Sequence, residues 1–302
     1  MKRNVLLASI LATLGLAAIA GPASAVTVVT STPELAAIAR EVGGTKVSVE
    51  SLAKPGQNYH QVEAKPTDVV KVAHADVYVR VGMDLDMWAD SVLRAARNPK
   101  VQEGGPGYVD GGRLIKKLEI PTAQISGASG DIHVYGNPHY WLDPGNGKVI
   151  AYEILLGLRA VDPANGGYYN EQYTRFAADV DQNIKKWEAR LASDRGKPVV
   201  AYHDEWIYFY TRFGLKPFGY LEPKPGIPPA PSHVQNLISS MKASGVKTVI
   251  VPDIYPNNFA TLIAKETGGE VALVPYSVGE QGTTTYISYI NAIVESVKKA
   301  LD

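Results

Sequence analysis

Short apolar runs alternate along the chain with longer segments in which apolar residues recur every three or four positions. The first run, residues 26–30, is rich in valine and threonine, as buried strands are, and a helical segment at 32–44 follows it. Thr32 and Glu34 suit a helix start, and the Gly-Gly at 43–44 suits a helix end. The same pairing continues with strands at 46–52 and 77–82, a helix that starts near residue 67, and a helix at 84–99. Such alternation predicts a parallel, βα-built sheet.

Between residues 147 and 195 the strand signal fades and helical periodicity dominates. Within this region, 168–196 can hold one helix of about 25 residues, which would span about 38 Å. Strand and helix then alternate again. Further strands are predicted at 197–203, 216–222, 247–253 and 270–276, and further helices at 204–214, 232–245, 256–269 and 286–301.

This pattern predicts an α/β protein in which two βα-alternating lobes with mainly parallel sheets are joined by one long, rigid linker helix. The expected domains are a signal peptide at 1–25, an N-terminal lobe at 26–160, the linker helix at 161–196 and a C-terminal lobe at 197–302. Ligands of such folds bind at the carboxyl ends of strands and between domains. Polar residues that follow strands are therefore the candidates for function.

The first 25 residues have the layout of a secretory signal. A basic start precedes an almost unbroken apolar run at 5–20, and Ala-Ser-Ala at 23–25 forms a small-residue cleavage site. A membrane anchor is the rival interpretation, but Gly-Pro at 21–22 breaks the run short of the roughly 18 apolar residues that a span needs. We expect cleavage after residue 25 and export to the periplasm. The chain has no cysteine, so we expect no lipid anchor.

The composition narrows the chemistry further. Thirty basic residues balance 30 acidic ones, which gives no electrostatic reason to expect nucleic acid or an anionic membrane as the partner. Without cysteine, disulfides and thiolate metal sites are excluded. Any metal must then be held by histidine, carboxylate or backbone oxygen. The six histidines are His60, His74, His133, His139, His203 and His233.

Three of these histidines follow strands or lie in rigid loops. His60 is in a polar loop after a strand, and His203 ends a strand. His139 lies in GNPHYWLDP (136–144), where prolines on both sides stiffen the backbone. A lone histidine of this kind is often structural, and it can also be a catalytic base. Three of them can instead converge on zinc, because imidazole is its commonest nitrogen ligand and a fourth position stays open for water or a carboxylate.

The other histidines point less clearly to a site. His74 lies within a helical segment and is expected to be structural, and His233 begins one and is expected to be exposed or capping. His133 follows the Gly/Ser-rich SGASGD, a composition typical of mobile segments. It can deliver or cover a metal, or be a solvated loop residue.

Four stretches together resemble a known family: YHQVEAKPTDVVKVAHADV, GNPHYWLDP, YHDEWIYFYTRFGL and KASGVKTVIVPDIYPNNFATLIAKETGGEV. They are similar to the zinc and manganese solute-binding proteins of ABC transporters, the ZnuA/TroA-like cluster A-I family. The resemblance covers essentially the whole chain after the leader. It implies that His60, His139 and His203 are metal ligands and that a helix bridges two α/β lobes. It also implies a membrane permease as the partner.

Two departures from the family pattern bear on the site. The family's usual acidic fourth ligand follows the last strand, and Val274 stands there in LVPYSVG. Asp253, Glu205 and His133 are the candidate fourth or accessory ligands, with Asp204, Glu63 and water as further possibilities. The chain also lacks the long His-rich loop of many zinc-type members. We expect the loop at 126–137 to order on metal binding.

Three imidazoles with at most one carboxylate favour Zn(II) as the transported ligand, with manganese or iron as the alternative. A His₃ zinc hydrolase with Glu205 as general base is a further alternative. No H-E-x-x-H or other catalytic signature is present, so we expect no enzyme activity. We expect a monomer that works with an ABC-transporter permease. A periplasmic zinc metallochaperone is a further candidate partner.

Overall fold

The first lobe is built on a four-stranded parallel sheet. The computed structural model describes residues 25–122, 130 and 133–302, so most of the expected leader and residues 126–129 and 131–132 of the loop 126–137 lie outside the described residues. The strands β1 (Val26–Thr30), β2 (Val47–Ser51), β3 (Val77–Arg80) and β4 (Tyr108–Asp110) stand in the order β2-β1-β3-β4. Each crossover between neighbouring strands carries the chain through a helix or loop, as parallel pairing requires.

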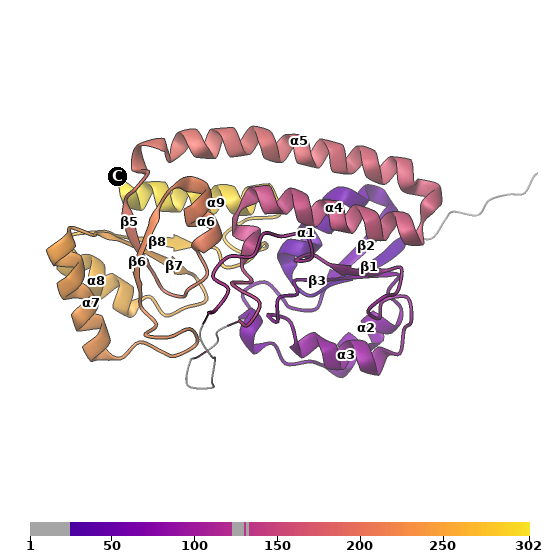
Figure 1. Ribbon diagram of the computed structural model, residues 1–302, viewed down its shortest axis with the longest axis horizontal. Coiled ribbons are helices and arrows are strands. Elements are labelled where there is room, and N and C mark those ends of the chain that lie inside the picture. Colours follow the sequence, from indigo (N-terminus) through magenta and orange to yellow (C-terminus); the bar gives the residue numbers. More distant parts are fainter. Residues whose placement is uncertain (1–24, 123–129, 131–132) are drawn as a thin grey trace, which may run out of the picture.

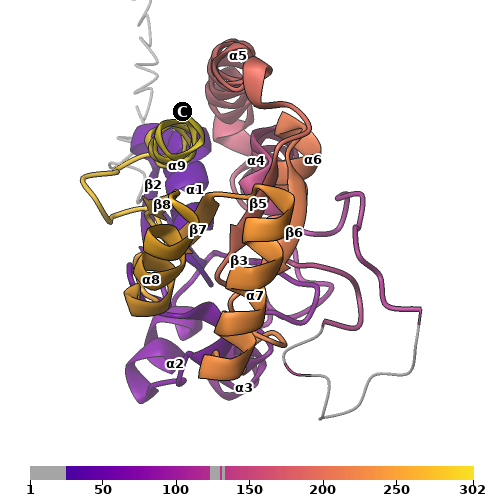
Figure 2. The same ribbon diagram turned by 90° about the vertical axis from the view of Figure 1, so that its left-hand side faces the viewer.

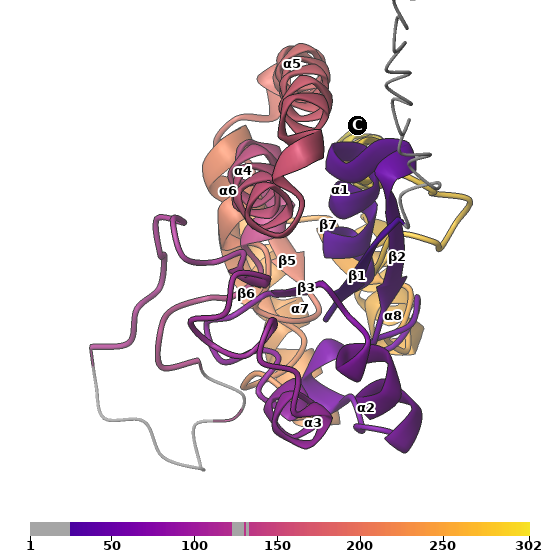
Figure 3. The same cartoon turned by 90° about the vertical axis from the view of Figure 1, so that its right-hand side faces the viewer.

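Alternate residues of these strands face opposite helical layers, because side chains of a strand alternate between its two faces. Val28 and Val79 pack toward α1 (Pro33–Gly43) and α4 (Pro144–Val161), whereas Tyr78 packs toward α2 (Pro66–Ala73) and α3 (Trp88–Ala96). Figure 3 shows α2 and α3 on the side of the sheet away from α1 and α4. Thr32 is the N-cap of α1 by its backbone, although its hydroxyl makes no capping hydrogen bond.

The second lobe repeats this plan. Its strands are β5 (Pro198–Ala201), β6 (Lys216–Tyr220), β7 (Thr248–Pro252) and β8 (Glu270–Val274), in the parallel order β6-β5-β7-β8. One face packs on α9 (Tyr286–Leu301) and α6 (Ile207–Phe213), and the other on α7 (Pro231–Ser244) and α8 (Asn258–Thr267). Figure 2 shows α7 and α8 on the side away from α9.

A long helix, α5 (Gly166–Arg190), connects the lobes. It runs along one side of the molecule across both lobes (Figure 1) and packs on α1 and α4 of the first lobe and α9 of the second. The helix is shorter than the expected 161–196, because α4 runs on to Val161 and short 3₁₀ turns flank α5. The largest apolar core cluster takes residues from both sheets, such as Val28 and Ile250, so one core continues through both lobes.

The predicted α/β class and its two parallel sheets are confirmed. β4 is an addition, because its three residues lie among glycines that hid it in the sequence pattern. Two 3₁₀ turns, η2 (Tyr59–Gln61) and η4 (Tyr140–Leu142), have no counterpart in the prediction either, and both adjoin candidate histidines. Within the described part of the chain, no helix combines the length and the apolar character needed to cross a membrane.

Candidate metal centre

His60 lies in the η2 turn after β2, and hydrogen bonds to residues of both lobes hold this turn in place. The Asn58 side chain accepts the His60 N–H at 2.9 Å. The neighbouring Tyr59 is fully buried, its N–H donates to the Tyr276 hydroxyl at 3.0 Å, and its carbonyl accepts the Trp88 indole N–H at 3.1 Å. Because Tyr276 belongs to the second lobe, the turn that carries His60 is anchored to both lobes.

His139 ends the loop before η4 and is almost fully buried. The Asn137 carboxamide oxygen accepts both the His139 N–H at 3.1 Å and its Nδ1–H at 2.9 Å. The Asn137 amide nitrogen in turn donates to Glu119 and to the Asp204 carbonyl, which fixes the orientation of the amide. With its proton on Nδ1, the His139 ring presents an unprotonated Nε2 as a metal donor.

His203 follows β5 by two residues, at the carboxyl end of the second sheet. Its Nδ1 lies 2.7 Å from Glu222 Oε2, which also accepts the Gly226 N–H at 3.0 Å. A carboxylate on one imidazole nitrogen orients the ring and raises the basicity of the other nitrogen, the usual support of a metal-binding histidine. The sequence offered a signal for Glu222, because it ends the predicted strand 216–222, yet it was missed.

The structure brings these three histidines together. Their potential ligand atoms all lie within 4.8 Å of one another, and no other set of three or more such groups occurs among residues 25–122, 130 and 133–302. His60 Nε2 and His139 Nε2 are 3.2 Å apart. The ring centroids lie 5.3 Å (His60–His139), 5.0 Å (His60–His203) and 5.5 Å (His139–His203) apart. Zinc–nitrogen bonds of about 2.1 Å in tetrahedral geometry need nitrogens about 3.4 Å apart.

Burial shifts the pKa values of these rings. It lowers the pKa of His60 and of His139 well below the ordinary value, and the neighbouring imidazoles lower both further. Burial would also lower the pKa of His203, but the hydrogen bond to Glu222 and the nearby Glu205 outweigh it and raise that pKa. The first two rings are thus held in the neutral form that binds metal.

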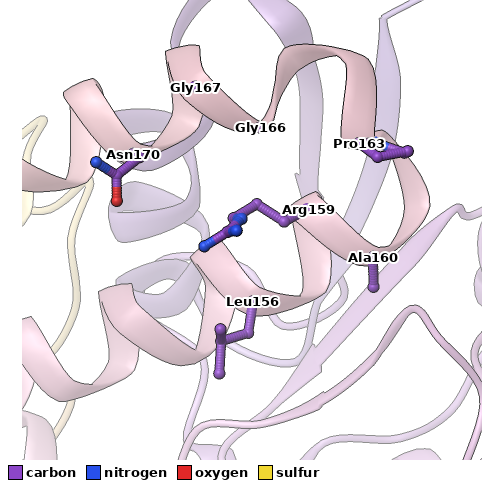
Figure 4. Close-up of a pocket in the computed structure, with 7 residues that line it drawn as sticks. All are labelled: Leu156, Arg159, Ala160, Pro163, Gly166, Gly167 and Asn170. Carbon is purple, nitrogen blue, oxygen red and sulfur yellow. The ribbon is translucent and has the colours of Figure 1, made fainter.

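A cavity of about 360 Å³ leads to the cluster from the surface between the lobes. Asn58 and His60 line it from the first lobe, and His203, Glu222 and Tyr255 line it from the second. By contrast, a depression of about 760 Å³ where α4 meets α5 holds Arg159 as its only ionisable lining group (Figure 4). That depression offers no histidine or carboxylate, so it is no candidate for the metal.

The candidate fourth ligands Asp253, Glu205 and His133 are not part of the cluster. The Asp253 carboxylate accepts the Tyr276 N–H at 3.0 Å and the Gln281 amide at 2.9 Å, so it braces the loop after β8. Glu205 is buried with one carboxylate oxygen unpaired, and burial raises its pKa to about 7. His133 lies beside His60, with ring centroids 5.2 Å apart.

Other candidate residues are placed as follows. Glu63 is exposed, and one Asp204 carboxylate oxygen is buried without a hydrogen-bond partner among the residues that the structure describes. Val274 ends β8 and is buried in the core, so it offers no metal ligand. In the loop that follows β8, the Tyr276 hydroxyl accepts a hydrogen bond from the turn that carries His60.

The two remaining histidines lie apart from the cluster. His74 is exposed at the C-cap of α2. His233 is half-buried and its Nε2 lies 2.9 Å from the Tyr220 carbonyl, so it ties α7 to β6 and does not cap the helix.

Comparison with known proteins identifies the family to which this chain belongs. The family model described as "Zinc-uptake complex component A periplasmic", ZnuA, matches residues 28–300. The chain belongs to this family. Its members are extracytoplasmic substrate-binding components of metal ABC transporters, which act with a membrane permease and an ATPase.

Individual members are named for different metals. The iron-binding protein YfeA of Yersinia pestis is 28% identical over 283 residues, covering 90% of this chain and 85% of that protein. The high-affinity zinc uptake protein ZnuA of Brucella abortus (strain 2308) is 23% identical over 297 residues, covering 88% of each chain. A crystal structure of ZnuA shares the fold, with a TM-score of 0.77 at 21% identity over 92% of this chain and all of that one. The chain thus belongs to a family whose members are named for different metals, including iron and zinc.

Proposed function

We propose that this ZnuA-family protein captures Zn(II) in the periplasm between its two lobes and delivers it to the permease of an ABC importer. His60 and His139 of the first lobe and His203 of the second are the ligands. The observation that carries the proposal is the convergence of three imidazoles whose ligand atoms lie within 4.8 Å of one another. The supports of His139 and His203 favour the proposal, because Asn137 and Glu222 occupy one ring nitrogen and leave the other free.

The donor set favours zinc among the metals for which family members are named. Zinc binds readily to imidazole nitrogen in tetrahedral sites, whereas Mn(II) suits carboxylate, carbonyl and water oxygens. No carboxylate belongs to the cluster within the described residues. Manganese or iron remains the alternative cargo, and an iron-binding relative at 28% identity is the reason to test it.

Capture does not require chemistry at the metal. A His₃ zinc hydrolase would need a general base next to the open coordination position. Glu205, two residues after His203, is the candidate for that role, but the members of the chain's family are substrate-binding components of ABC transporters. We therefore propose a transport role, with the protein acting as an exported monomer whose leader is cleaved. A periplasmic metallochaperone that loads it is part of the same proposal.

Zinc titration of purified protein against a competing chelator tests the ligands. His139→Ala should weaken zinc binding by on the order of 100-fold or more, since even supporting residues are worth 10–100-fold. The matched control is His74→Ala, which removes an exposed histidine outside the cluster and should bind like the wild type. Wild-type affinity in His139→Ala would overturn the proposed site.

A second experiment tests the metal. The metal-free protein is incubated with equal concentrations of Zn(II), Mn(II) and Fe(II) without oxygen, desalted and analysed for bound elements. One equivalent of zinc is expected. Retention of manganese or iron in preference to zinc would replace the proposed cargo, and ester or peptide hydrolysis that His139→Ala abolishes would replace transport with catalysis.

A further inference from the structure

A fourth imidazole, that of His133, lies beside two of the three clustered histidines, His60 and His139. Its ring centroid is 5.2 Å from that of His60 and 6.3 Å from that of His139. The side chain is 14% exposed, and its Nε2 is buried without a hydrogen-bond partner in the described part of the chain. A buried polar atom without a partner needs an explanation, and next to two rings of a candidate metal centre a bound ion provides one.

Asp84 determines which nitrogen of His133 is free. One Asp84 carboxylate oxygen is hydrogen-bonded to His133 Nδ1, and the other accepts the Val134 N–H at 2.9 Å. Because a carboxylate only accepts, the His133 proton lies on Nδ1 and the lone pair on Nε2. Asp84 thus supports His133 as Glu222 supports His203, in the carboxylate–histidine arrangement typical of metal ligands.

The backbone around Asp84 shows that this contact is built into the fold. Met83 and Asp84 both have left-handed backbone conformations, with φ of 48° and 62°. Residues other than glycine seldom adopt this backbone conformation, and they keep it where the surrounding structure holds them. Asp86 holds this part of the backbone in place, because its carboxylate accepts the N–H groups of Val81 at 2.7 Å and Gly82 at 3.1 Å.

The spacing of the His133 ring to His60 and His139 is close to that of imidazoles bound to one zinc ion. With a zinc–nitrogen bond of about 2.1 Å and the ring centre about 1 Å beyond the nitrogen, tetrahedrally bound rings have centroids about 5 Å apart. His133 already meets this spacing to His60 and lies about 1 Å too far from His139. We propose that His133 moves in by about this distance and completes the zinc site as its fourth ligand, positioned by Asp84. This inference rests on the proposed function.

The other donors near the cluster fit the fourth position less well. Both Asp253 oxygens are taken by the loop after β8. Glu205, a charge neighbour of His203, also has a buried carboxylate oxygen without a hydrogen-bond partner among the described residues and is the competing donor, whereas the His133 ring lies beside both His60 and His139. Four neutral imidazoles without an anionic ligand would also discriminate against Mn(II) more strongly than a mixed site.

Cobalt(II) serves as the spectroscopic probe, because four-coordinate Co(II) absorbs visible light more strongly than five- or six-coordinate Co(II). Wild type should give the intense spectrum of a four-nitrogen site, and X-ray absorption of the zinc form should count four imidazoles. His133→Ala should lower the imidazole count to three, change the cobalt spectrum and weaken zinc binding by roughly 10-fold or more. His74→Ala is the control and should match the wild type in all three.

Asp84 is tested as a positioning residue by a double-mutant cycle. Asp84→Ala should weaken zinc binding by roughly 10-fold, and adding it to His133→Ala should cause little further loss, because it acts through that ring. A full additional loss in the double variant would show a separate structural role and refute the positioning. Asp179→Ala, exposed on α5, is the control.

The outcomes separate this inference from the proposed function. Loss of zinc binding in His139→Ala with unchanged affinity and cobalt spectrum in His133→Ala would overturn only the fourth ligand. If Glu205→Gln instead reproduced the expected loss of affinity and changed the cobalt spectrum, a carboxylate would take that place. Wild-type affinity in both His139→Ala and His133→Ala would overturn the site as a whole.

Discussion

Glu34 in the first turn of α1 is a fully buried carboxylate that joins the two lobes. It accepts the Tyr59 hydroxyl at 2.9 and 2.8 Å, one residue from His60, and the Val278 N–H of the second lobe at 3.1 Å. These hydrogen bonds favour the ionised form, but burial outweighs them and raises the pKa of Glu34 from 4.5 to about 7. The group is therefore protonated in the folded protein at a pH where the unfolded chain has already lost the proton.

The sign of the effect on stability follows from proton binding. Between pH 4.5 and about 7 the folded state binds one proton more than the unfolded state, so stability falls as the pH rises through this window. A pKa shift of this size lowers the free energy of unfolding by about 3 kcal/mol, and the full loss is reached above pH 7. Glu34→Gln cannot titrate. We therefore predict that the stability of the variant relative to wild type rises by about 3 kcal/mol between pH 4.5 and pH 8.

Urea unfolding at intervals from pH 4.5 to pH 8.5, with EDTA to keep the protein metal-free, measures this difference. The difference in free energy of unfolding between Glu34→Gln and wild type at any one pH depends on how the buried amide is accommodated. The tested quantity is therefore the change of that difference with pH. The control Glu171→Gln, exposed on α5, should track the wild type at every pH. A Glu34→Gln difference that stays constant within about 0.5 kcal/mol across this range would refute the reasoning.

Two further predictions concern His203 and α4. Glu222→Gln removes the charge that supports His203 and should weaken zinc binding by roughly 10–100-fold, measured by chelator competition; unchanged affinity would contradict its supporting role. Gly147→Ala places a methyl 2.3 Å from the ring of buried Tyr286 and should lower the free energy of unfolding by about 1–3 kcal/mol. In the control Gly167→Ala on α5, the added methyl meets nothing within 4 Å, so the free energy of unfolding should stay the same or rise by up to about 1 kcal/mol. Equal effects of the two substitutions in urea unfolding would argue against a clash at Gly147.

The strands and helices were largely predictable, because buried parallel strands appear as apolar runs between amphipathic helices. The C-terminal helix has the predicted bounds, 286–301. β4 escaped detection since three residues among glycines carry no periodicity, and the sheet supplies their order by pairing them with β3. The ends of α5 were misjudged because 3₁₀ turns continue the helical pattern beyond the helix itself.

The site was predictable only in part. The positions of His60, His139 and His203 after strands or in rigid loops drew attention to them, and the structure brings them together. Contacts between distant residues around the site were not predictable, because the pairs Asp84–His133 and Glu34–Val278 join residues 49 and 244 positions apart. No local pattern records such a contact. Glu34 therefore looked like an ordinary acidic residue at a helix start, although it lies at the junction of the lobes.

The core that runs through both lobes has a consequence for the way in which cargo enters and leaves. Parting the lobes would expose apolar surface, at about 2.5 kcal/mol for every 100 Å². The shared core thus disfavours a wide opening of the lobes, and an ion at the cluster would enter and leave through the cavity beside His60 and His203. Exchange of the ion would then depend on local movement of the turns that carry His60 and His139, while the two lobes stay packed on their common core.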